Sequence, residues 1–516
     1  MIQNKALPPF KSYPPSRKDP AACRGELDLF NTRYWLYLFI IFHLVGWTLV
    51  PAVIRHNLPI DSIEGSIWGQ QLEWGYDKNP FLNGWLTALA IYLSHRSDWM
   101  IYFFSQLSVV ICFLSVWHLA RTILPATLAL LAVLLLEGVQ YYNFHAIDFN
   151  DNTLELSLFS LTIYFFYQAL HTKTYRAWCA TGCFAALCLM AKYYAIVLFI
   201  PMFLFLLLYP ENRDQLKTIR PYCGLLLFIL IILPHFIWLF SNDFVTVRYA
   251  FERVGNPPSW RNHLFFPLQF AWQQLEVFLP ALFLFGIFFI GKKPFLAPQK
   301  ISSFNKLFLF WMGLGPFLTT LLLSLLFGMK LRAGWGMPLL SLWSILLLII
   351  LTPHLTKAKL YRFITVIFIF IPLLLSTYSF SLMYSKTETS ANFPGHLLAK
   401  TMEKKWNDTY HTPLFYVGGS RWMSGNVSYY SNNHPTVFIE WNPLFSPWIN
   451  QNEMKKRGAL FVWDITNGES LPKAVQEKFK NLTPPRTLEL NWERNQTHLP
   501  PIQIGFVLLP PEKATA

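Results

Sequence analysis

The chain has 516 residues, of which 53% are hydrophobic and only 14% are charged. Soluble domains average about 25% charged residues, so this composition excludes an ordinary soluble globular protein and indicates one that lies largely in lipid. The formal net charge of +14 does not indicate a nucleic-acid partner, because the basic residues of membrane proteins sort to one side of the bilayer.

The first 33 residues are polar and rich in proline, and they lack the apolar stretch of a cleavable signal peptide. We expect residues 1–33 to form a cytoplasmic tail and residues 34–384 to form a transmembrane domain. Spanning a bilayer takes roughly 20 apolar residues. The apolar runs and their polar breaks predict about eleven spans, at residues 34–54, 98–120, 123–142, 152–170, 177–191, 194–210, 221–240, 265–290, 307–327, 336–352 and 363–384.

The distribution of basic residues predicts the orientation of these spans. If the N-terminus is cytoplasmic, the tail and loops on that side hold about nineteen Lys and Arg residues and the opposite loops about nine. The positive-inside rule therefore favours a cytoplasmic N-terminus. An odd number of spans then places residues 385–516 on the outer side of the membrane.

Residues 385–516 change in character, because they gain charge and lose long apolar runs. Short strand-like stretches alternate with helix-like stretches around residues 396–406 and 470–480. The strand-like stretches are residues 414–417, 436–440, 459–463 and 502–509. We predict a small α/β domain outside the membrane, joined to an α-helical polytopic membrane domain.

The first outer loop, residues 55–97, is long enough to indicate a function. From Asp61 onward, Ile63, Ile67, Trp68 and Leu72 fall at helical spacing. This spacing predicts a helix in the membrane interface, with Trp and Tyr side chains at headgroup level.

Asp61 and Glu64 are three residues apart and would share one face at the start of this helix. Asp-x-x-Glu before an apolar helical run is also typical of a capping box, which is a purely structural interpretation. The two interpretations are compatible, since a capping carboxylate can still face a site.

A second acidic cluster follows the third predicted span. It contains Asp148, Asn150, Asp151 and Glu155. Glu155 lies one turn inside a predicted spanning helix, where a carboxylate is costly unless it faces water or a partner. Helix capping is an alternative explanation for Asp151, but it does not explain Glu155.

Cations are predicted at the same outer level as these carboxylates. Lys192 falls at the turn between the fifth and sixth spans, Arg332 joins the ninth and tenth, and Arg253 lies in another outer loop. Each alone is explained by snorkelling toward lipid headgroups. Together with the carboxylates, they form what a phosphate-bearing lipid substrate needs, because cations neutralise a phosphate leaving group.

Four separated motifs resemble one family, the bacterial glycosyltransferases related to protein O-mannosyltransferases. The motifs are Asp61-x-x-Glu64 with the following Trp68-Gly69 to Leu86 segment, Phe149 to Thr153, Ala191 to Tyr194, and Arg332-Ala-Gly-Trp335-Gly336-Met-Pro338. The family includes lipopolysaccharide core transferases and lipid A aminoarabinose transferases. Many relatives have Lys-His-Pro-Pro where this chain has Lys78-Asn79-Pro80-Phe81, so no role is carried over for those histidines.

The resemblance implies a multi-span fold of the GT-C type, a polyprenyl-phosphate sugar donor, and Asp61 as the catalytic carboxylate, with Glu64 beside it. The expected reaction is an inverting displacement in which Asp61 acts as general base. We predict that the donor phosphate binds Lys78, Lys192, Arg332 and Arg253. We predict that the acceptor or sugar contacts Asp148, Asn150, Asp151, Glu155, Tyr76 and Trp335. A divalent cation, Mg²⁺ or Mn²⁺, is an alternative ligand for Asp61, Glu64 and Asp151.

The resemblance also implies a location in a bacterial inner membrane and an acceptor that is lipid A, lipopolysaccharide, another glycan or a protein. Two other classes of function remain open at this point. A transporter or lipid flippase would place its polar residues near the bilayer midplane, often in two related halves, and this sequence has no convincing internal repeat. A non-catalytic assembly protein would use the outer domain as its working part.

Overall fold

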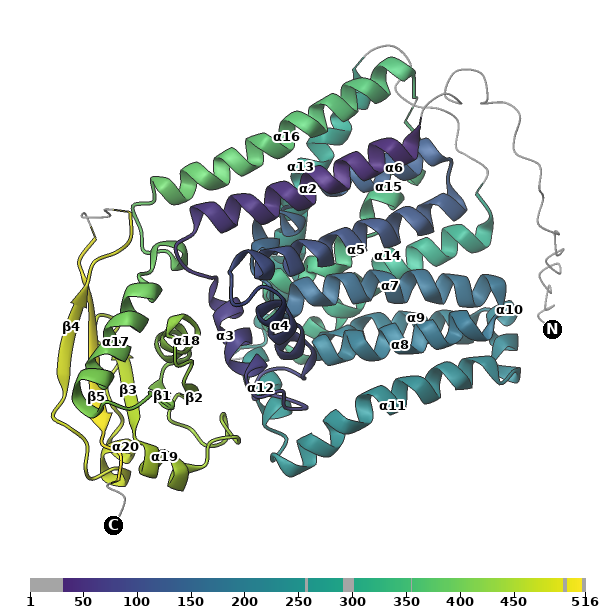
Figure 1. Ribbon diagram of the computed structural model, residues 1–516. Helices are drawn as coiled ribbons and strands as arrows, with labels where there is room; N and C mark the ends of the chain where they lie inside the picture. Colours follow the sequence, from purple (N-terminus) through teal and green to yellow (C-terminus); the bar gives the residue numbers. More distant parts are fainter. Residues whose placement is uncertain (1–30, 256–258, 291–300, 354, 495–498, 513–516) are drawn as a thin grey trace.

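The computed structural model describes residues 31–255, 259–290, 301–353, 355–494 and 499–512. A bundle of long helices carries, at one end, a smaller domain built on a β-sheet (Figure 1). Most of the predicted tail, residues 1–30, lies outside the described residues. The helical membrane domain and the small C-terminal α/β domain that the sequence predicts are both confirmed; the latter is called the outer domain, after its predicted side of the membrane.

Six helices of the described chain are long and apolar enough to cross a bilayer. They are α2 (Thr32–Ile54), α5 (Trp99–Ile123), α11 (Arg220–Ser241), α13 with η5 (Asn262–Phe289), α14 (Ser303–Phe327) and α16 (Lys357–Met383). Three further spans result if each strongly bent pair of helices is counted once. These pairs are α6 (Ala126–Leu136) with η1 and η2 (Gln140–Ile147), η3 and α9 (Tyr193–Leu208) with α10 and η4 (Pro210–Lys217), and η6 (Ala333–Leu340) with α15 (Trp343–Leu351).

The predicted count of eleven spans is not confirmed. The remaining two predicted spans correspond to α7 (Asp151–Thr172) and α8 (Tyr175–Ala191), which do not meet the same criteria of length and apolarity. The helix α7 packs between α5 and α8 inside the bundle, so its polar side chains do not have to face lipid. The predicted break after Ala191 is confirmed, because α8 ends there and η3 begins at Tyr193.

The outer domain contains a five-stranded mixed sheet in the order β2-β1-β3-β5-β4. The strand β1 pairs in parallel with β2 and β3, whereas β5 is antiparallel to β3 and β4. The strands are β1 (Tyr416–Gly419), β2 (Thr436–Ile439), β3 (Ala459–Asp464), β4 (Arg486–Leu490) and β5 (Ile502–Leu509). The helices are η7 (Ser390–Asn392), α17 (Gly395–Tyr410), α18 (Arg421–Tyr430), α19 (Gln451–Arg457) and α20 (Lys473–Lys478).

The first outer loop forms α3 (Ile60–Gly69) and α4 (Leu82–Leu93). It contacts the short helix α12 (Val245–Val254), where the Thr246 hydroxyl donates to the Tyr76 carbonyl. The outer domain covers α3, because α18 lies against it at the domain boundary (Figure 1). Gly425 of α18 allows this approach, since a Cβ there would come within 2.6 Å of the Ile63 side chain.

Trp68 and Tyr76 of the first loop are not at an exposed surface, as the predicted interfacial position would require, whereas Trp74 is 40% exposed. Trp68 and Tyr76 are buried, and their rings stack with centroids 5.2 Å apart. They pack beneath the outer domain, in the same apolar cluster as α18 and the sheet. Leu72 lies beyond the end of α3 and is exposed.

The contact between α8 and α11 provides a test of the bundle. Gly182 and Gly224 bring the two backbones together, and a Cβ on Gly182 would clash with the Gly224 carbonyl oxygen. Small residues permit such close helix packing in membranes. We expect Gly182→Ala to lower the stability of the purified protein by about 1–3 kcal/mol, through overpacking, measured as a fall in melting temperature. Gly286→Ala is the control, because nothing lies within 4 Å of a Cβ there; equal melting temperatures for both variants would contradict this packing.

Candidate active site

The N-terminus of α3 is held by a carboxylate from a distant part of the chain. The backbone N–H groups of Asp61 and Ser62 donate to the Asp148 carboxylate at 3.3 and 3.0 Å, and the Ser62 hydroxyl donates to it at 2.7 Å. The N-cap residue of α3 is Pro59, with no side-chain cap. The capping-box interpretation of Asp61 and Glu64 is therefore wrong, and both side chains are available for other contacts.

Asn150 links α3 to the start of α7. Its side-chain oxygen accepts from the N–H groups of Asn152 and Thr153 at 3.0 and 3.1 Å, which makes it the N-cap of α7. Its side-chain nitrogen donates to Asp61 Oδ2 at 3.0 Å. Asn150 therefore fixes the Asp61 carboxylate, and Asp151 is not the cap of α7.

The surroundings of Asp61 favour its protonated form. Burial, with the negative charges of Asp148, Glu64 and Asp151, raises the pKa of Asp61 to about 8, and the hydrogen bond from Asn150 opposes this rise. Burial also raises the pKa of Asp148. A carboxylate with a pKa near neutrality is a much stronger base than an ordinary aspartate.

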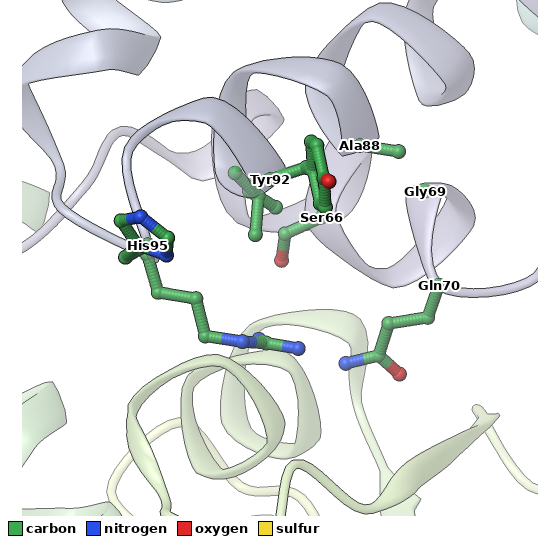
Figure 2. Close-up of a pocket in the computed structure, with 8 residues that line it drawn as sticks. Ser66, Gly69, Gln70, Ala88, Tyr92 and His95 are labelled. Atoms are coloured by element: carbon green, nitrogen blue, oxygen red, sulfur yellow. The ribbon is translucent and has the colours of Figure 1, made fainter.

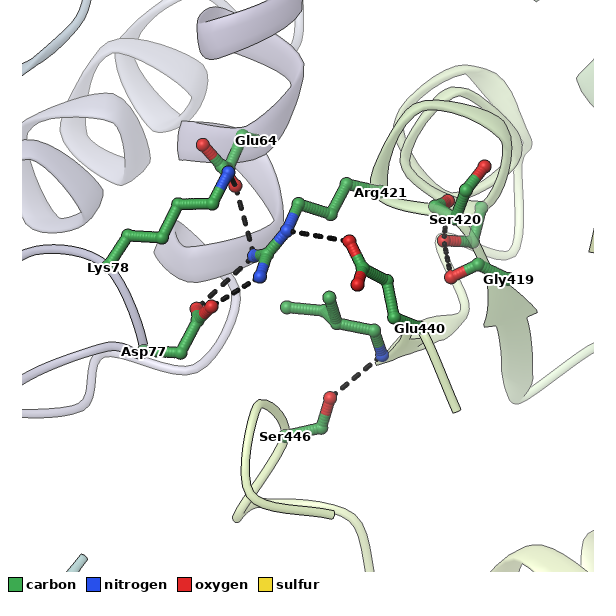
Figure 3. Close-up of polar contacts among 10 residues, drawn as sticks. Glu64, Asp77, Lys78, Gly419, Ser420, Arg421, Glu440 and Ser446 are labelled. Carbon is green, nitrogen blue, oxygen red and sulfur yellow. Dashed lines mark hydrogen bonds and ion pairs between the residues drawn. The ribbon is translucent and has the colours of Figure 1, made fainter. Parts of the chain in front are cut away.

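Glu64 belongs to an ion-pair network that crosses between the two domains (Figure 3). Its Oε1 lies 2.7 Å from Lys78 Nζ and 3.0 Å from Arg421 Nη1. The Arg421 guanidinium also binds both oxygens of Asp77 and contacts Glu440 Oε1 at 3.2 Å. Arg421 is the first residue of α18, so the outer domain contributes a cation to the site.

Lys192 joins three elements at the other side of the site. It pairs with Asp151 Oδ2 at 2.9 Å, donates to the side-chain oxygen of Asn152, and lies over the Trp335 ring at 5.4 Å from the centroid. One turn further along α7, Glu155 is completely buried, and neither of its carboxylate oxygens has a hydrogen-bond partner in the described chain.

Arg253 and Arg332 are brought together by the backbone. The Lys330 N–H donates to the Val254 carbonyl at 3.1 Å, which joins the loop before η6 to the end of α12. Burial and the charge of Arg253 lower the pKa of Arg332, whereas the charge of Asp61 acts in the opposite direction. Among the described ion pairs, neither arginine has a carboxylate partner. Both side chains are exposed, and Arg332 lies close enough to Asp61 to interact with its charge.

Tyr249 lies between Arg253 and the Glu64 network. Lys78 Nζ is 5.7 Å from the centroid of its ring, and the Arg253 guanidinium carbon is 5.8 Å from the same centroid. Lys78 and the unpaired Arg253 are therefore both neighbours of the Tyr249 ring.

The structure brings together most of the side chains that the sequence predicts for the site. Tyr76 is an exception, because it is buried and its hydroxyl donates to the Trp68 carbonyl at 2.9 Å. The Asp148 carboxylate already accepts from the start of α3, and the Asn150 side chain already bonds to α7 and Asp61, so neither is free to bind the acceptor or sugar as predicted. Arg421 was not predicted, since a lone basic residue after a short strand gives no signal in the sequence.

The residues do not fit a divalent cation. In the described part of the chain, no three His, Cys, Asp or Glu side chains are placed to hold a metal ion. Of the suggested ligands, Glu64 is paired with Lys78 and Asp151 with Lys192. A cation would have to displace both lysines.

Comparisons with known proteins show the same resemblance as the motifs. Residues 78–238 match the family model described as dolichyl-phosphate-mannose-protein mannosyltransferase. The lipopolysaccharide core galacturonosyltransferase RgtA of Rhizobium johnstonii is 23% identical over 198 residues, and the match spans 38% of this chain and 39% of RgtA.

Solved structures match over almost the whole chain. The crystal structure of ArnT from Cupriavidus metallidurans bound to undecaprenyl phosphate superposes with a TM-score of 0.63 and 13% identity, covering 94% of this chain and 99% of ArnT. Its apo state gives a TM-score of 0.61 at 13% identity, covering 92% and 98%.

These findings confirm the resemblance to the glycosyltransferases related to protein O-mannosyltransferases. The chain is a multi-span membrane protein with the GT-C fold, in the arrangement seen in ArnT. It carries the α/β outer domain at the end of the bundle next to α3 and α12 (Figure 1).

The Arg421 network gives a test of how the two domains are joined. Arg421→Gln would leave Glu64 and Asp77 with fewer partners in a largely buried position, where loss of one partner is costly, about 3 kcal/mol or more. We expect a clear fall in melting temperature and faster proteolytic release of the outer domain. Arg457→Gln is the control, because Arg457 forms an exposed pair with Glu453 within α19 and should have little effect. Equal behaviour of the two variants would contradict a structural role for Arg421.

Proposed function

We propose that this chain is a glycosyltransferase that moves a sugar from a polyprenyl-phosphate donor to an acceptor at the outer face of the bacterial inner membrane. The observation that carries the proposal is the partly buried carboxylate of Asp61, whose charge acts on the exposed, unpaired Arg332, with Arg253 as the neighbour of Arg332. The match to RgtA, a lipopolysaccharide core galacturonosyltransferase, and to an ArnT structure that contains undecaprenyl phosphate supports the donor class. We propose lipid A, lipopolysaccharide, another glycan or a protein as the acceptor.

In the proposed reaction, Asp61 removes the proton from the acceptor hydroxyl. The hydroxyl oxygen forms a bond to the anomeric carbon of the sugar, and the bond from that carbon to the phosphate oxygen breaks. The configuration inverts because the displacement has a single step. The polyprenyl phosphate leaves with the electron pair of the broken bond, and its additional negative charge requires stabilisation by cations.

Arg253 and Arg332 are suited to this stabilising role because neither has to leave a carboxylate before it binds phosphate. Arginine also binds phosphate through two parallel hydrogen bonds. Lys78 is paired with Glu64, so its contribution to phosphate binding would require exchange of partners. When Lys78 turns away, Arg421 can still neutralise the negative charge of Glu64, since it already contacts the same oxygen.

Other predicted site residues receive more limited roles. Asn150 orients Asp61, and Asp148 fixes the start of α3. Lys192 is paired with Asp151, so this pair is proposed to border the sugar site and not to bind the donor phosphate alone. Glu155 retains unpartnered oxygens, and we propose that it accepts a hydrogen bond from a sugar hydroxyl.

Replacement of Asp61 tests the proposed reaction. Asp61→Asn keeps the shape and the hydrogen-bonding oxygen but removes the base, which contributes about 10²–10⁴-fold to such reactions. We expect mass spectrometry of envelope glycolipids to show one missing hexose, pentose or aminosugar unit in both a deletion strain and the Asp61→Asn strain. The control is Asp408→Asn, an exposed aspartate of α17, which should retain the wild-type profile.

A complete glycolipid and glycoprotein profile in the Asp61→Asn strain would contradict the enzyme proposal. Transport of a lipid by the purified protein without formation of a glycosylated product would favour the flippase alternative.

The pH dependence of the transfer gives a second test. The wild-type rate should fall as the pH falls through the raised pKa of Asp61, because only the deprotonated form is a base. Asp148→Asn removes a neighbouring negative charge, so the pKa of Asp61 should fall and the acidic limb of the profile should move to lower pH. The measurement is the initial rate of transfer in membranes over a range of pH, with Asp408→Asn as control. A limb that stays in place or moves to higher pH would contradict the assignment.

A further inference from the structure

A cavity that Asp61 does not line opens beside α3. It has a volume of about 400 Å³. It is lined by Ser66 and Gly69 of α3, by Gln70 directly after α3, by α4, and by His95 and Arg96 after α4. Figure 2 shows His95 at one side and Gln70 at the other, with Ser66 between them.

The helix α3 separates this cavity from the proposed active site. At about 100° per residue, Ser66 and Gln70 lie on a face turned well away from Asp61 and Glu64. The outer domain bounds the cavity on the far side, because the Gln70 side-chain nitrogen donates to the Ser428 hydroxyl of α18 at 2.8 Å.

Arg96 contributes a cation to the cavity that nothing in the described chain neutralises. No ion pair of the described residues includes it. Burial lowers the pKa of Arg96, and among neighbouring groups only Tyr429 opposes this effect. The nearest carboxylate in sequence, Asp98, already accepts hydrogen bonds from the Tyr429 and Tyr430 hydroxyls, each at 3.1 Å. A half-buried guanidinium without a counter-charge is suited to bind an anion.

The backbone at this position is strained. His95 and Arg96 have φ values of 51° and 67°, in the left-handed region that favours glycine. Two consecutive residues with full side chains in this region cost free energy. Two side chains with basic groups stand at these positions, and both line the cavity.

The surface next to the cavity is apolar and is not covered by protein. Leu89, Tyr92 and Leu93 of α4 are 43%, 78% and 52% exposed. Their spacing of three and four residues places them on one face of α4. In a membrane protein, such a face at the outer end of the bundle is covered by acyl chains, and a cation beside it lies at headgroup level.

We propose that this cavity binds the phosphate of a lipid in the outer leaflet, with Arg96 as its cation, Gln70 and His95 as polar neighbours, and α4 as the surface for the acyl chains. The site does not depend on the proposed transfer reaction. The lipid is either a phospholipid or a phosphate-bearing acceptor glycolipid, since both present the same chemistry.

Native mass spectrometry of the full-length protein in detergent tests the site. Phosphatidylglycerol should be retained in preference to phosphatidylcholine. Arg96→Gln should weaken phosphatidylglycerol binding by about tenfold, as expected for loss of a charge-assisted hydrogen bond. Arg261→Gln is the matched control, because Arg261 is an exposed arginine of another outer segment, and it should bind as the wild type does. Retention of phosphatidylglycerol by Arg96→Gln, or no preference for it in the wild type, would overturn the proposal.

Arg96→Gly separates lipid binding from folding. Glycine relieves the left-handed backbone and removes the cation, so the melting temperature should be equal or higher while anionic lipid is lost. A lower melting temperature with unchanged lipid binding would show that Arg96 has a structural role, against the proposal.

Competition identifies the source of the phosphate. If lipid A displaces bound phosphatidylglycerol from the wild type, the site takes the acceptor class, and Arg96→Gln should raise KM for that acceptor with kcat unchanged. If phosphatidylglycerol remains bound in an excess of lipid A, the site takes a phospholipid. Tight binding of either lipid by Arg96→Gln would contradict the role of Arg96 for that lipid.

Discussion

The structure depends on pairing or hydrogen-bonding the carboxylates that lie at one end of the helical bundle. A buried charge is costly unless it is paired or hydrogen-bonded. Here the compensation comes from remote parts of the chain: Asp148 receives the N–H groups at the start of α3, and Glu64 receives Lys78 and Arg421. The bundle, the first outer loop and the outer domain must therefore assemble together. Asp61 has one amide donor and three acidic neighbours, and this surplus of negative charge raises its pKa.

The sequence predicts those residues of this arrangement whose polarity differs from that of their neighbours along the chain. Carboxylates next to apolar runs stand out, and the family motifs place Asp61 and Lys192 in one site before any geometry is known. The break after Ala191 was predictable because a lysine in mid-membrane is costly, and the structure confirms it. The alternation of short strands and helices after residue 385 was likewise sufficient to predict the α/β domain.

Other features depend on tertiary contacts and have no local signal. Trp68 and Tyr76 are of the residue types enriched at membrane interfaces, but the outer domain covers them. Asp148 binds N–H groups that lie 86 and 87 residues away in sequence, and Arg421 pairs with Asp77 across 344 residues. The span count is not confirmed, because the interior helix α7 lacks the apolar composition of a lipid-facing helix and α8 is short.

The most direct test of the central claim is a cryo-EM structure of the full-length protein in lipid nanodiscs with a polyprenyl phosphate, such as undecaprenyl phosphate. The account predicts that the phosphate lies within hydrogen-bond distance, about 2.7–2.9 Å, of Arg253 and Arg332, on the side that Asp61 faces. It also predicts that Lys78 has moved away from Glu64 toward the phosphate. A phosphate bound elsewhere, with Asp61 directed into open solvent, would contradict the account.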